Sequence, residues 1–204
     1  MIAMPMFPLG SVLFPHMPLP LRVFENRYLV MLSRILEEDP AEFGVVLIER
    51  GQEVGGGEHR FTVGTVARIA QLEATDDFVV LVAEGRQRIA VSEWLADDPH
   101  PVAEVTVLPD LEWDDSLTDL RDEAERVVRR ALARASEFDS QAWPPDVELS
   151  SDPASACWQL AGVAPVGTMD QVAMLQAATM RALLQAVIDN TQAAEETFDF
   201  NSGP

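Results

Sequence analysis

The feature that most constrains the fold is a change in residue pattern near residue 110. Before this point, short apolar runs alternate with glycine and proline, which is typical of β-strands joined by turns. From about residue 114 the chain is rich in alanine and its apolar residues recur every three or four positions, which is typical of amphipathic helices. We therefore expect a β-rich subdomain over residues 1–110, a helical bundle over residues 111–195 and a flexible tail over residues 196–204.

The first region predicts one helix among several short strands. Residues 25–38 carry a single apolar stripe and end at Asp39-Pro40, because the residue before a proline disfavours the helical conformation. Short strands separated by turn signals favour a small barrel or folded sheet over a parallel, doubly wound one, so the expected fold class is α+β. The expected strands are 43–48, 62–72, 78–83, 86–91 and 102–108, with a turn at Glu84-Gly85.

The second region predicts three helices. The first begins after capping residues near Asp114 and runs to about Phe138. The second follows the cap Asp152, which is succeeded by a proline at the first helical position, and it ends at Gly162. The third covers residues 170–189.

The charge of the chain is far from balanced. Its 204 residues include 34 Asp and Glu against 14 basic residues, a formal net charge of −20. Such a chain repels phosphate backbones and anionic lipid, so we expect neither nucleic acid nor a membrane as a partner. All 14 basic residues are arginines. Without lysine, the chain cannot hold nucleotide phosphates as a P-loop does, and it cannot form a Schiff base or a Ser-Lys pair.

No pattern predicts a catalytic, cofactor or metal site. The histidines, His16, His59 and His100, stand apart from one another without a metal-ligand spacing. The single cysteine, Cys157, lies in a predicted helix, which favours a buried, inert thiol over a nucleophile. One cysteine cannot form an internal disulfide, and no basic segment precedes the apolar N-terminus, so we expect a cytoplasmic protein.

The stretch LPLRVFENRY, residues 19–28, gathers aromatic and charged side chains and includes the only tyrosine of the chain. Phe24 and Tyr28 are four residues apart at the start of the predicted helix, so we expect them to pack together and onto the sheet. We expect Arg27 to face away from Tyr28 and to bond a nearby carbonyl or carboxylate. The cluster is interpreted as a joint between helix and sheet, with direct contact to a ligand as the alternative.

Short motifs follow one another in a fixed order along most of the chain. They are Phe7-Pro-Leu9, Val12-Leu-Phe-Pro15, Leu19-Pro-Leu21, Phe24-Glu25, Arg27-Tyr28, Phe43-Gly-Val-Val-Leu47, Val63-Gly-Thr65, Gly85, Arg88-Ile89 and Asp152-Pro153. This series resembles the N-terminal, substrate-binding domain of Lon proteases over about residues 5–188. The chain departs from the family pattern in the turn Ala74-Thr-Asp-Asp77, and also at Val102 and Gln176. The resemblance implies a PUA-like pseudobarrel followed by a small helical bundle, in a stand-alone bacterial form without the ATPase and peptidase domains.

The resemblance also implies a non-catalytic binding module that acts in protein quality control or proteolysis. Its expected partners are unfolded or apolar polypeptide segments or a partner protein, and a second copy of the chain is a further candidate. A PUA-like fold suggests RNA as well, but the net charge argues against it. The alternative is an enzyme of unrecognised type with carboxylates or a histidine in a cleft.

The residues considered for peptide binding lie in the first part of the chain. Methionine and aromatic side chains adapt to irregular apolar partners, although packing in the core is the competing interpretation of the same residues. The candidates are Met6, Phe7, Phe14, Phe24, Arg27 and Tyr28.

Overall fold

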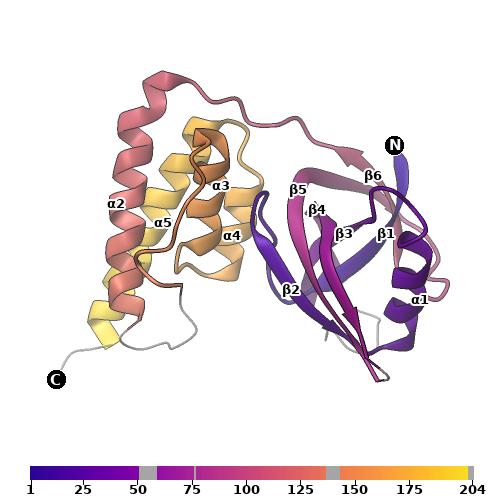
Figure 1. Ribbon diagram of the computed structural model, residues 1–204. Helices are drawn as coiled ribbons and strands as arrows, with labels where there is room; N and C mark the ends of the chain where they lie inside the picture. The colour runs from indigo at the N-terminus through magenta and orange to yellow at the C-terminus, as the bar shows by residue number, and fades with distance from the viewer. Residues whose placement is uncertain (51–58, 76, 137–142, 202–204) are drawn as a thin grey trace. The chain divides into compact units, whose positions relative to one another are not determined.

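The computed structural model describes residues 1–50, 59–75, 77–136 and 143–201. The chain divides into two compact units, Met1–Asp110 and Leu111–Pro204. Figure 1 shows strands and one helix in the first unit and helices in the second. Each unit is described by itself below.

The first unit is a mixed sheet with one helix. The helix α1, Asn26–Ile35, lies in sequence between the second and third strands. Each strand except β2 pairs with at least two others, in the order β2-β5-β4-β3-β1-β6 with a further pairing of β5 with β6. The strands are β1 (Ile2–Leu9), β2 (Pro18–Val23), β3 (Glu42–Arg50), β4 (His59–Ala74), β5 (Val79–Trp94) and β6 (Val102–Val107).

The long strand β5 closes the sheet on itself. Residues 79–84 of β5 pair with β2, whereas residues 89–94 pair with β6. Because β5 also pairs with β4, the strands β5, β4, β3, β1 and β6 form a closed ring and β2 is attached outside it. The result is a pseudobarrel rather than a regular barrel, and the expected α+β fold class is confirmed.

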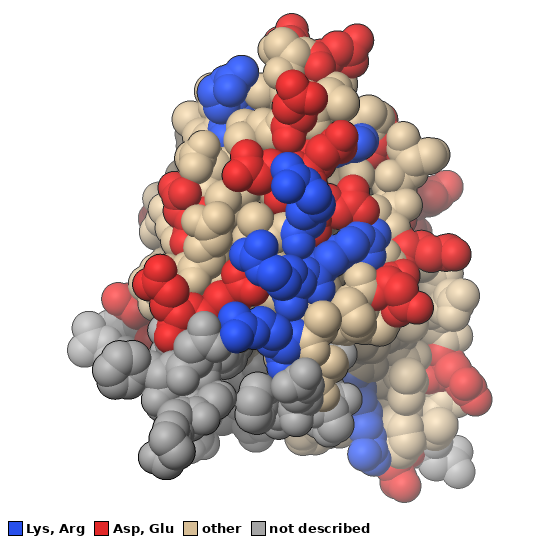
Figure 2. All heavy atoms as spheres, turned by 90° about the vertical axis from the view of Figure 1, so that its left-hand side faces the viewer, with Lys and Arg blue, Asp and Glu red and all other residues tan. Residues whose placement is uncertain are grey.

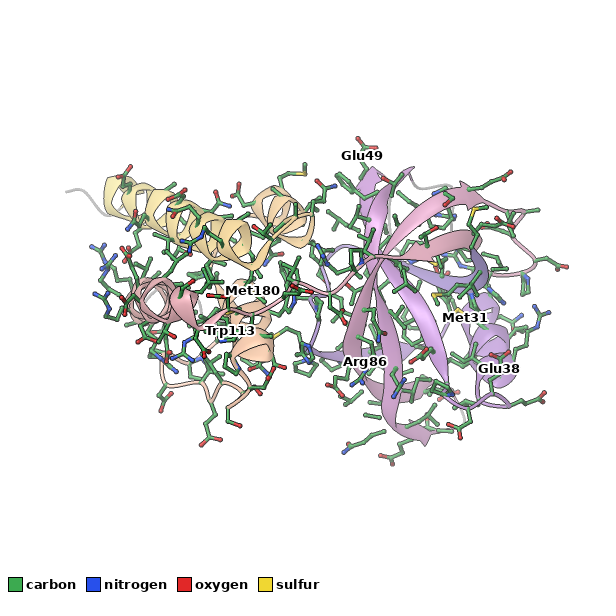
Figure 3. All side chains as sticks on the ribbon, turned by 90° about the horizontal axis from the view of Figure 1, so that it is seen from above. Met31, Glu38, Glu49, Arg86, Trp113 and Met180 are labelled. Carbon is green, nitrogen blue, oxygen red and sulfur yellow. The ribbon has the colours of Figure 1, made fainter. Side chains whose placement is uncertain are left out.

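The interior of the ring is a close-packed apolar cluster contributed by different strands. Its buried members are Met6, Val46, Val66, Ile89, Val91, Ala103 and Val105. On the other side of β1, α1 buries an apolar stripe that includes Tyr28, Met31 and Ile35. In Figure 3, Met31 lies between α1 and the strands, whereas Glu38, just beyond the helix, lies on the outside.

Gly85 is not in a turn, and the predicted turn at Glu84-Gly85 is wrong. The two strands expected on either side of it are one strand, β5. Residues 13–17 cross this strand at Gly85: the Gly85 N–H donates to the Met17 carbonyl at 2.9 Å, and the His16 N–H donates to the Gly85 carbonyl at 2.8 Å. A Cβ at residue 85 would overlap the carbonyl oxygen of Phe14, so the close approach of two backbones requires glycine here.

Thr65 holds the same crossing segment from the neighbouring strand β4. Its hydroxyl is fully buried and donates to the carbonyl of Leu13 at 2.6 Å. The segment is therefore attached to two adjacent strands, and buried polar groups of its backbone are satisfied without water.

The second unit consists of helices. A short 3₁₀ turn, η1 (Asp115–Leu117), leads into α2, and the Asp114 side chain accepts a hydrogen bond from the Ser116 N–H at 2.8 Å. Glu195 of α5 is buried, and its carboxylate accepts a hydrogen bond from Arg130 of α2. This contact joins the two helices. The helices are α2 (Thr118–Ala135), α3 (Pro153–Val163), α4 (Thr168–Leu175) and α5 (Met180–Asn201).

The cap prediction at Asp152 is confirmed, but several predicted helix boundaries are wrong. Asp152 accepts from the Ser155 N–H at 2.9 Å, yet α3 continues through Gly162, because the buried neighbours Leu160, Ala161 and Val163 keep packing inward. The helix predicted over residues 170–189 is two helices, and the Thr179 hydroxyl, which accepts from the Ala182 N–H at 3.1 Å, caps the second.

The C-terminal ends of α2 and α5 bear on two further predictions. α2 ends at Ala135, and the predicted end at Phe138 lies outside the described residues. α5 reaches Asn201, so residues 196–201 are helical rather than the start of a tail, and residues 202–204 lie outside the described residues.

Replacing Gly85 by alanine is expected to destabilise the first unit by about 3 kcal/mol, the upper end for overpacking, because the methyl group meets rigid backbone. The measurement is urea unfolding monitored by circular dichroism. Gly167→Ala is the control: its Cβ would lie 3.3 Å from a movable Asp170 carboxylate oxygen, and its cost should stay below about 1 kcal/mol. If both variants lost the same free energy of unfolding, the requirement for glycine at residue 85 would be contradicted.

Candidate functional site

Tyr28 docks α1 onto the sheet by stacking rather than by pairing with Phe24. Its ring is parallel to that of Phe7 in β1, with the centroids 3.9 Å apart and an angle of 9° between the planes. Phe43 in β3 lies tilted against Phe7 at a centroid distance of 6.0 Å. The joint predicted between helix and sheet is therefore present, but Phe24 does not take part in these ring contacts and is 57% exposed.

Arg27 does not face away from Tyr28, contrary to the expectation. Its guanidinium carbon lies 4.5 Å from the centre of the Tyr28 ring. Since Phe7 covers one face of that ring, the guanidinium covers the other and adds a cation–π contact. Its Nε also donates to a Glu25 carboxylate oxygen at 3.2 Å, as expected for a neighbouring carboxylate.

Most of the candidate peptide-binding residues lie in the core of the first unit. Met6 faces the interior of the ring and Phe7 faces α1, because β1 is covered on both of its faces. Phe24 reaches the surface, and Arg27 is half-buried on the Tyr28 ring. Peptide binding by the six candidates stays a prediction. Of the six side chains, a partner could touch only Phe24 and Arg27 directly. The side chains that the structure buries are Met6, Phe7, Phe14 and Tyr28.

An exposed apolar surface lies where β2 and the first half of β5 extend beyond the ring. In this register Pro20 is opposite Val82 and Arg22 is opposite Val80, so these side chains share one face of the sheet. We call this surface the flap face and define it by Pro20, Arg22, Phe78, Val80 and Val82.

The flap face combines apolar side chains with one stacked arginine. The Arg22 guanidinium carbon lies 4.0 Å from the centre of the Phe78 ring. Val80 is 41% exposed, and Phe24, which is more exposed, follows directly after β2. A shallow groove of about 220 Å³ runs along the face towards β4, and its lining comprises Gln71, Leu72, Glu73, Val80, Leu81 and Val82.

Sequence reasoning missed the flap face because the run Phe78–Ala83 is wholly apolar and suggests a buried strand. A signal was present in the neighbouring strands. Glu73 of β4 lies opposite Val80, and prolines alternate with leucines at the start of β2. Polar residues and prolines at alternating positions indicate that this face of the sheet is not covered.

Groups that could support catalysis serve structural purposes. Cys157 is fully buried, and burial raises the pKa of its thiol to about 12. Hydrogen bonds from the side chain and the backbone of Ser116 lower the pKa of Asp114, which caps η1. Burial likewise lowers the pKa of Arg88, whose guanidinium donates to the Pro109 carbonyl at 2.9 Å. His100 is buried beside Arg34 of α1, with 3.4 Å between their nitrogens.

Neither a metal site nor a membrane-spanning helix is found among the described residues. Across residues 1–50, 59–75, 77–136 and 143–201, no group of three or more His, Cys, Asp or Glu side chains is placed to hold a metal ion. Within the same part of the chain, no helix has the length and apolar character needed to cross a membrane.

The fold and the motif series together define a class of protein. A crystal structure of a Lon N-terminal domain protein from Xanthomonas campestris is 28% identical, with a TM-score of 0.60 over 91% of this chain and 96% of that one. The N-terminal domain of a Mycobacterium avium complex Lon protease has the same fold, with a TM-score of 0.64 over 94% of this chain and 98% of that one, at 17% identity.

Sequence comparison identifies the family. Residues 3–192 match the model of the ATP-dependent protease La (LON) substrate-binding domain, and the chain belongs to this family. The Lon protease of Escherichia coli K12 is 30% identical over 183 residues, which are 86% of this chain and 23% of the relative. Lon protease 2 of Myxococcus xanthus is 34% identical over 110 residues. The chain spans less than a quarter of the length of these curated relatives.

The buried thiol predicts a pH dependence of stability. Folding raises the pKa of Cys157 from its ordinary value of 9.0 to about 12, so only the unfolded chain loses this proton as the pH rises above 9. Stability contributed by the neutral thiol is complete below pH 9 and is lost as the pH rises towards 12. Between pH 8 and pH 10 the wild type should lose up to about 1.4 kcal/mol more than a Cys157→Ala variant.

Urea unfolding of both proteins at each pH measures this difference, and the variant corrects for every other group that titrates. Iodoacetamide should label Cys157 only under unfolding conditions, because the native thiol is protonated and inaccessible. Rapid labelling of the folded protein at pH 8 would contradict both expectations.

Proposed function

We propose that this protein is a non-catalytic module that binds unfolded or apolar polypeptide segments, and that it acts in protein quality control or proteolysis in the cytoplasm. The observation that carries the proposal is the exposed apolar flap face on a member of a substrate-binding domain family. Apolar side chains next to an arginine stacked on an aromatic ring are typical of the centre of protein-binding surfaces.

The flap face would bind through side chains rather than by adding a strand. Among the described strands, β2 is the one with a single neighbour, so it offers the free edge of the sheet. Pro18 and Pro20 lie in β2 and have no N–H group to donate to an added strand. An incoming chain could not form a complete ladder here, and its apolar side chains would instead rest on Val80, Val82 and Phe78.

The aromatic joint would support this surface from below. The stack of Phe7, Tyr28 and Arg27 fixes the start of α1 and, through the short connection from β2, the position of Phe24. In this proposal Phe24 and Arg27 contact the client, while the buried candidates Met6, Phe7, Phe14 and Tyr28 hold the surface in shape.

Cleavage of a client would need groups that these 204 residues do not supply. The 204 residues contain no lysine, which the nucleotide-binding loop and the Ser-Lys pair of ATP-dependent proteases of this kind require. In the proposed function these residues select and hold a client, and its degradation depends on an ATP-dependent protease activity that they do not supply.

Fluorescence anisotropy with a labelled, net-neutral peptide rich in phenylalanine, leucine and valine tests this function. A Gly-Ser peptide of equal length is the negative control. Replacing Val80 or Phe24 by serine should weaken binding of the apolar peptide about tenfold, the usual effect of truncating a central interface side chain. Met169→Ser removes an apolar side chain that is 63% exposed, more than Val80 or Phe24, from α4 and should leave the affinity unchanged.

Two further measurements separate the outcomes. Thermal unfolding by circular dichroism verifies that each variant is folded. A peptide with N-methylated backbone amides should bind as well as the normal one, because the flap face does not depend on main-chain pairing. Absence of wild-type binding to the apolar peptide would overturn the proposed function, and equal binding by all variants would overturn the flap face as its site.

A further inference from the structure

Two unlike charges flank the apolar centre of the flap face. In the register of the sheet, Val80 of β5 lies opposite Arg22 of β2 on one side and opposite Glu73 of β4 on the other. Residues directly opposite each other in neighbouring strands point to the same face of a sheet, so the three side chains form one row across the strands. All three are exposed. A positive and a negative charge therefore stand on either side of an exposed valine.

A second charged row on the same face is neutralised within the unit. Glu84 of β5 lies opposite Arg68 of β4. Arg68 forms an ion pair with Glu42 at 2.8 Å, and Arg86 forms one with Glu84 at 3.4 Å. The charges of this second row therefore have counter-charges without a client.

Arg22 and Glu73 differ from that row, because neither forms an ion pair with another residue that the structure describes. The Arg22 guanidinium carbon lies over the Phe78 ring, 4.0 Å from its centre. This cation–π contact holds the guanidinium in place without using its N–H donors, which can still bind a carboxylate. The Glu73 carboxylate can likewise accept a cation.

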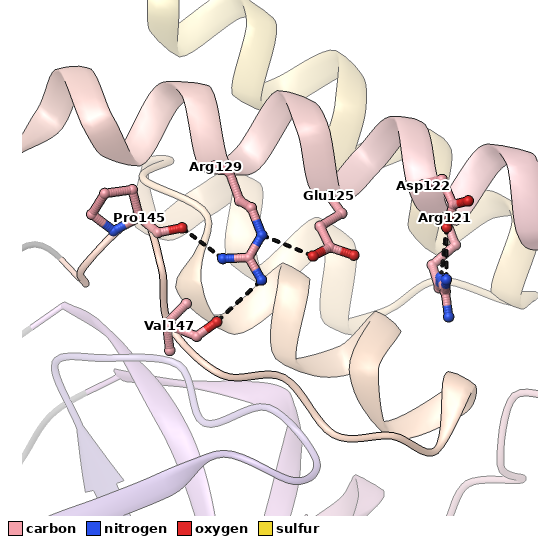
Figure 4. Close-up of polar contacts among 6 residues, drawn as sticks. All are labelled: Arg121, Asp122, Glu125, Arg129, Pro145 and Val147. Atoms are coloured by element: carbon pink, nitrogen blue, oxygen red, sulfur yellow. Dashed lines mark hydrogen bonds and ion pairs between the residues drawn. The ribbon is translucent and has the colours of Figure 1, made fainter.

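The arginines of α2 provide a contrast in the second unit. Blue side chains gather on the side of this unit where Figure 1 places α2, with red side chains around them (Figure 2). Arg129 donates to Glu125 at 2.8 Å and also to two backbone carbonyls (Figure 4). Arg130 forms a double hydrogen bond with Glu195. These two arginines therefore stabilise the helical unit itself.

We propose that the flap face selects client segments in which an apolar residue lies between an acidic and a basic residue. This inference rests on the proposed function and adds a chemical class of client to it. The acidic side chain of the client pairs with Arg22, the apolar side chain packs on Val80, and the basic side chain pairs with Glu73. Complementary charges on both sides of an apolar contact give specificity and fix how the client lies on the face.

The width of the row sets the spacing of these residues in the client. Neighbouring strands are about 4.8 Å apart, so the Cα atoms of Arg22 and Glu73 are separated by about 10 Å, with Val80 between them. In an extended client that crosses the strands, every second side chain points towards the sheet, and residues four apart in sequence are about 13 Å apart. The long charged side chains cover the remaining difference. The client pattern is therefore acidic–x–apolar–x–basic, where x is any residue.

A client with charges of one sign fits this row less well. An acidic segment is attracted by Arg22 but is repelled by Glu73 and by the net charge of −20. A basic segment is attracted by that net charge but meets Arg22 in the row itself. An uncharged segment leaves both Arg22 and Glu73 without a counter-charge. Only the segment with both charges matches all three positions of the row.

Four labelled peptides of equal length test the pattern. They share their apolar residues and a central phenylalanine, and they differ only at the positions two residues before and two residues after it. These positions hold Asp/Lys, Ser/Ser, Lys/Lys or Asp/Asp. In fluorescence anisotropy at physiological salt, the Asp/Lys peptide should bind the wild type about fivefold more tightly than the Ser/Ser peptide, because exposed ion pairs contribute modestly. It should also bind more tightly than either peptide of one sign.

Reversing the charges of the row should change the preferred peptide in a defined way. Arg22→Glu makes both flanks acidic, so the Lys/Lys peptide should bind this variant most tightly. Glu73→Arg makes both flanks basic, so the Asp/Asp peptide should bind that variant most tightly. The double variant again has one charge of each sign and should prefer the Asp/Lys peptide. A purely structural role of either residue would not reverse the order of the peptides, and thermal unfolding by circular dichroism verifies that each variant is folded.

The matched controls are Arg126→Glu and Glu123→Arg, which change the net charge by the same amounts at exposed positions of α2. Both should keep the wild-type order of peptides, and a change of order in them would overturn the inference and assign the preference to net charge. Equal binding of the Asp/Lys and Ser/Ser peptides to the wild type would also overturn it, as would a double variant that does not recover the preference. In these cases the proposed function stands. If none of the four peptides bound, the proposed function would fail, and this inference with it.

Discussion

The crossing of residues 13–17 over Gly85 is the constraint on which the first unit depends. Two backbone hydrogen bonds join His16 and Met17 to Gly85, and a side chain at residue 85 would collide with the carbonyl of Phe14. This crossing comes where β5 changes partners, from β2 before it to β6 after it. At Gly85 the strand β5 leaves β2 and goes on to pair with β6, which closes the ring. The closed ring and the exposed flap face therefore both depend on this crossing.

The exposed and buried aromatic residues of the first unit have different tasks as a consequence. Within the closed unit, Phe7 and Tyr28 stack and fix α1, and Arg27 completes the stack from outside. On the flap face, Val80 is 41% exposed, and the Arg22 guanidinium lies over the Phe78 ring. An apolar surface of this kind is costly for a protein to leave in water, which is the reason to assign a binding function to it.

Charge restricts what each surface can bind. A net charge of −20 disfavours contact with nucleic acid and anionic membranes, and in the proposed function apolar contact is the basis for recognising a client. The acidic residues of α2 come before its arginines in sequence, except for Arg121. This order suits the helix dipole.

The sequence by itself determined what depends on near neighbours in the chain: the change from strand to helix pattern, the apolar stripe of α1, the cap at Asp152 and the chemistry that a lysine-free chain lacks. Through the order of its motifs it also indicated the family. The tertiary structure alone decided that Glu84 and Gly85 lie within a strand, that Arg27 stacks on Tyr28 and that Val80 is exposed although its run is wholly apolar. The physical reason is that a strand's faces are buried or exposed according to which segments pack on them, and here those segments lie tens of residues away in the sequence, as Leu13 and Thr65 do.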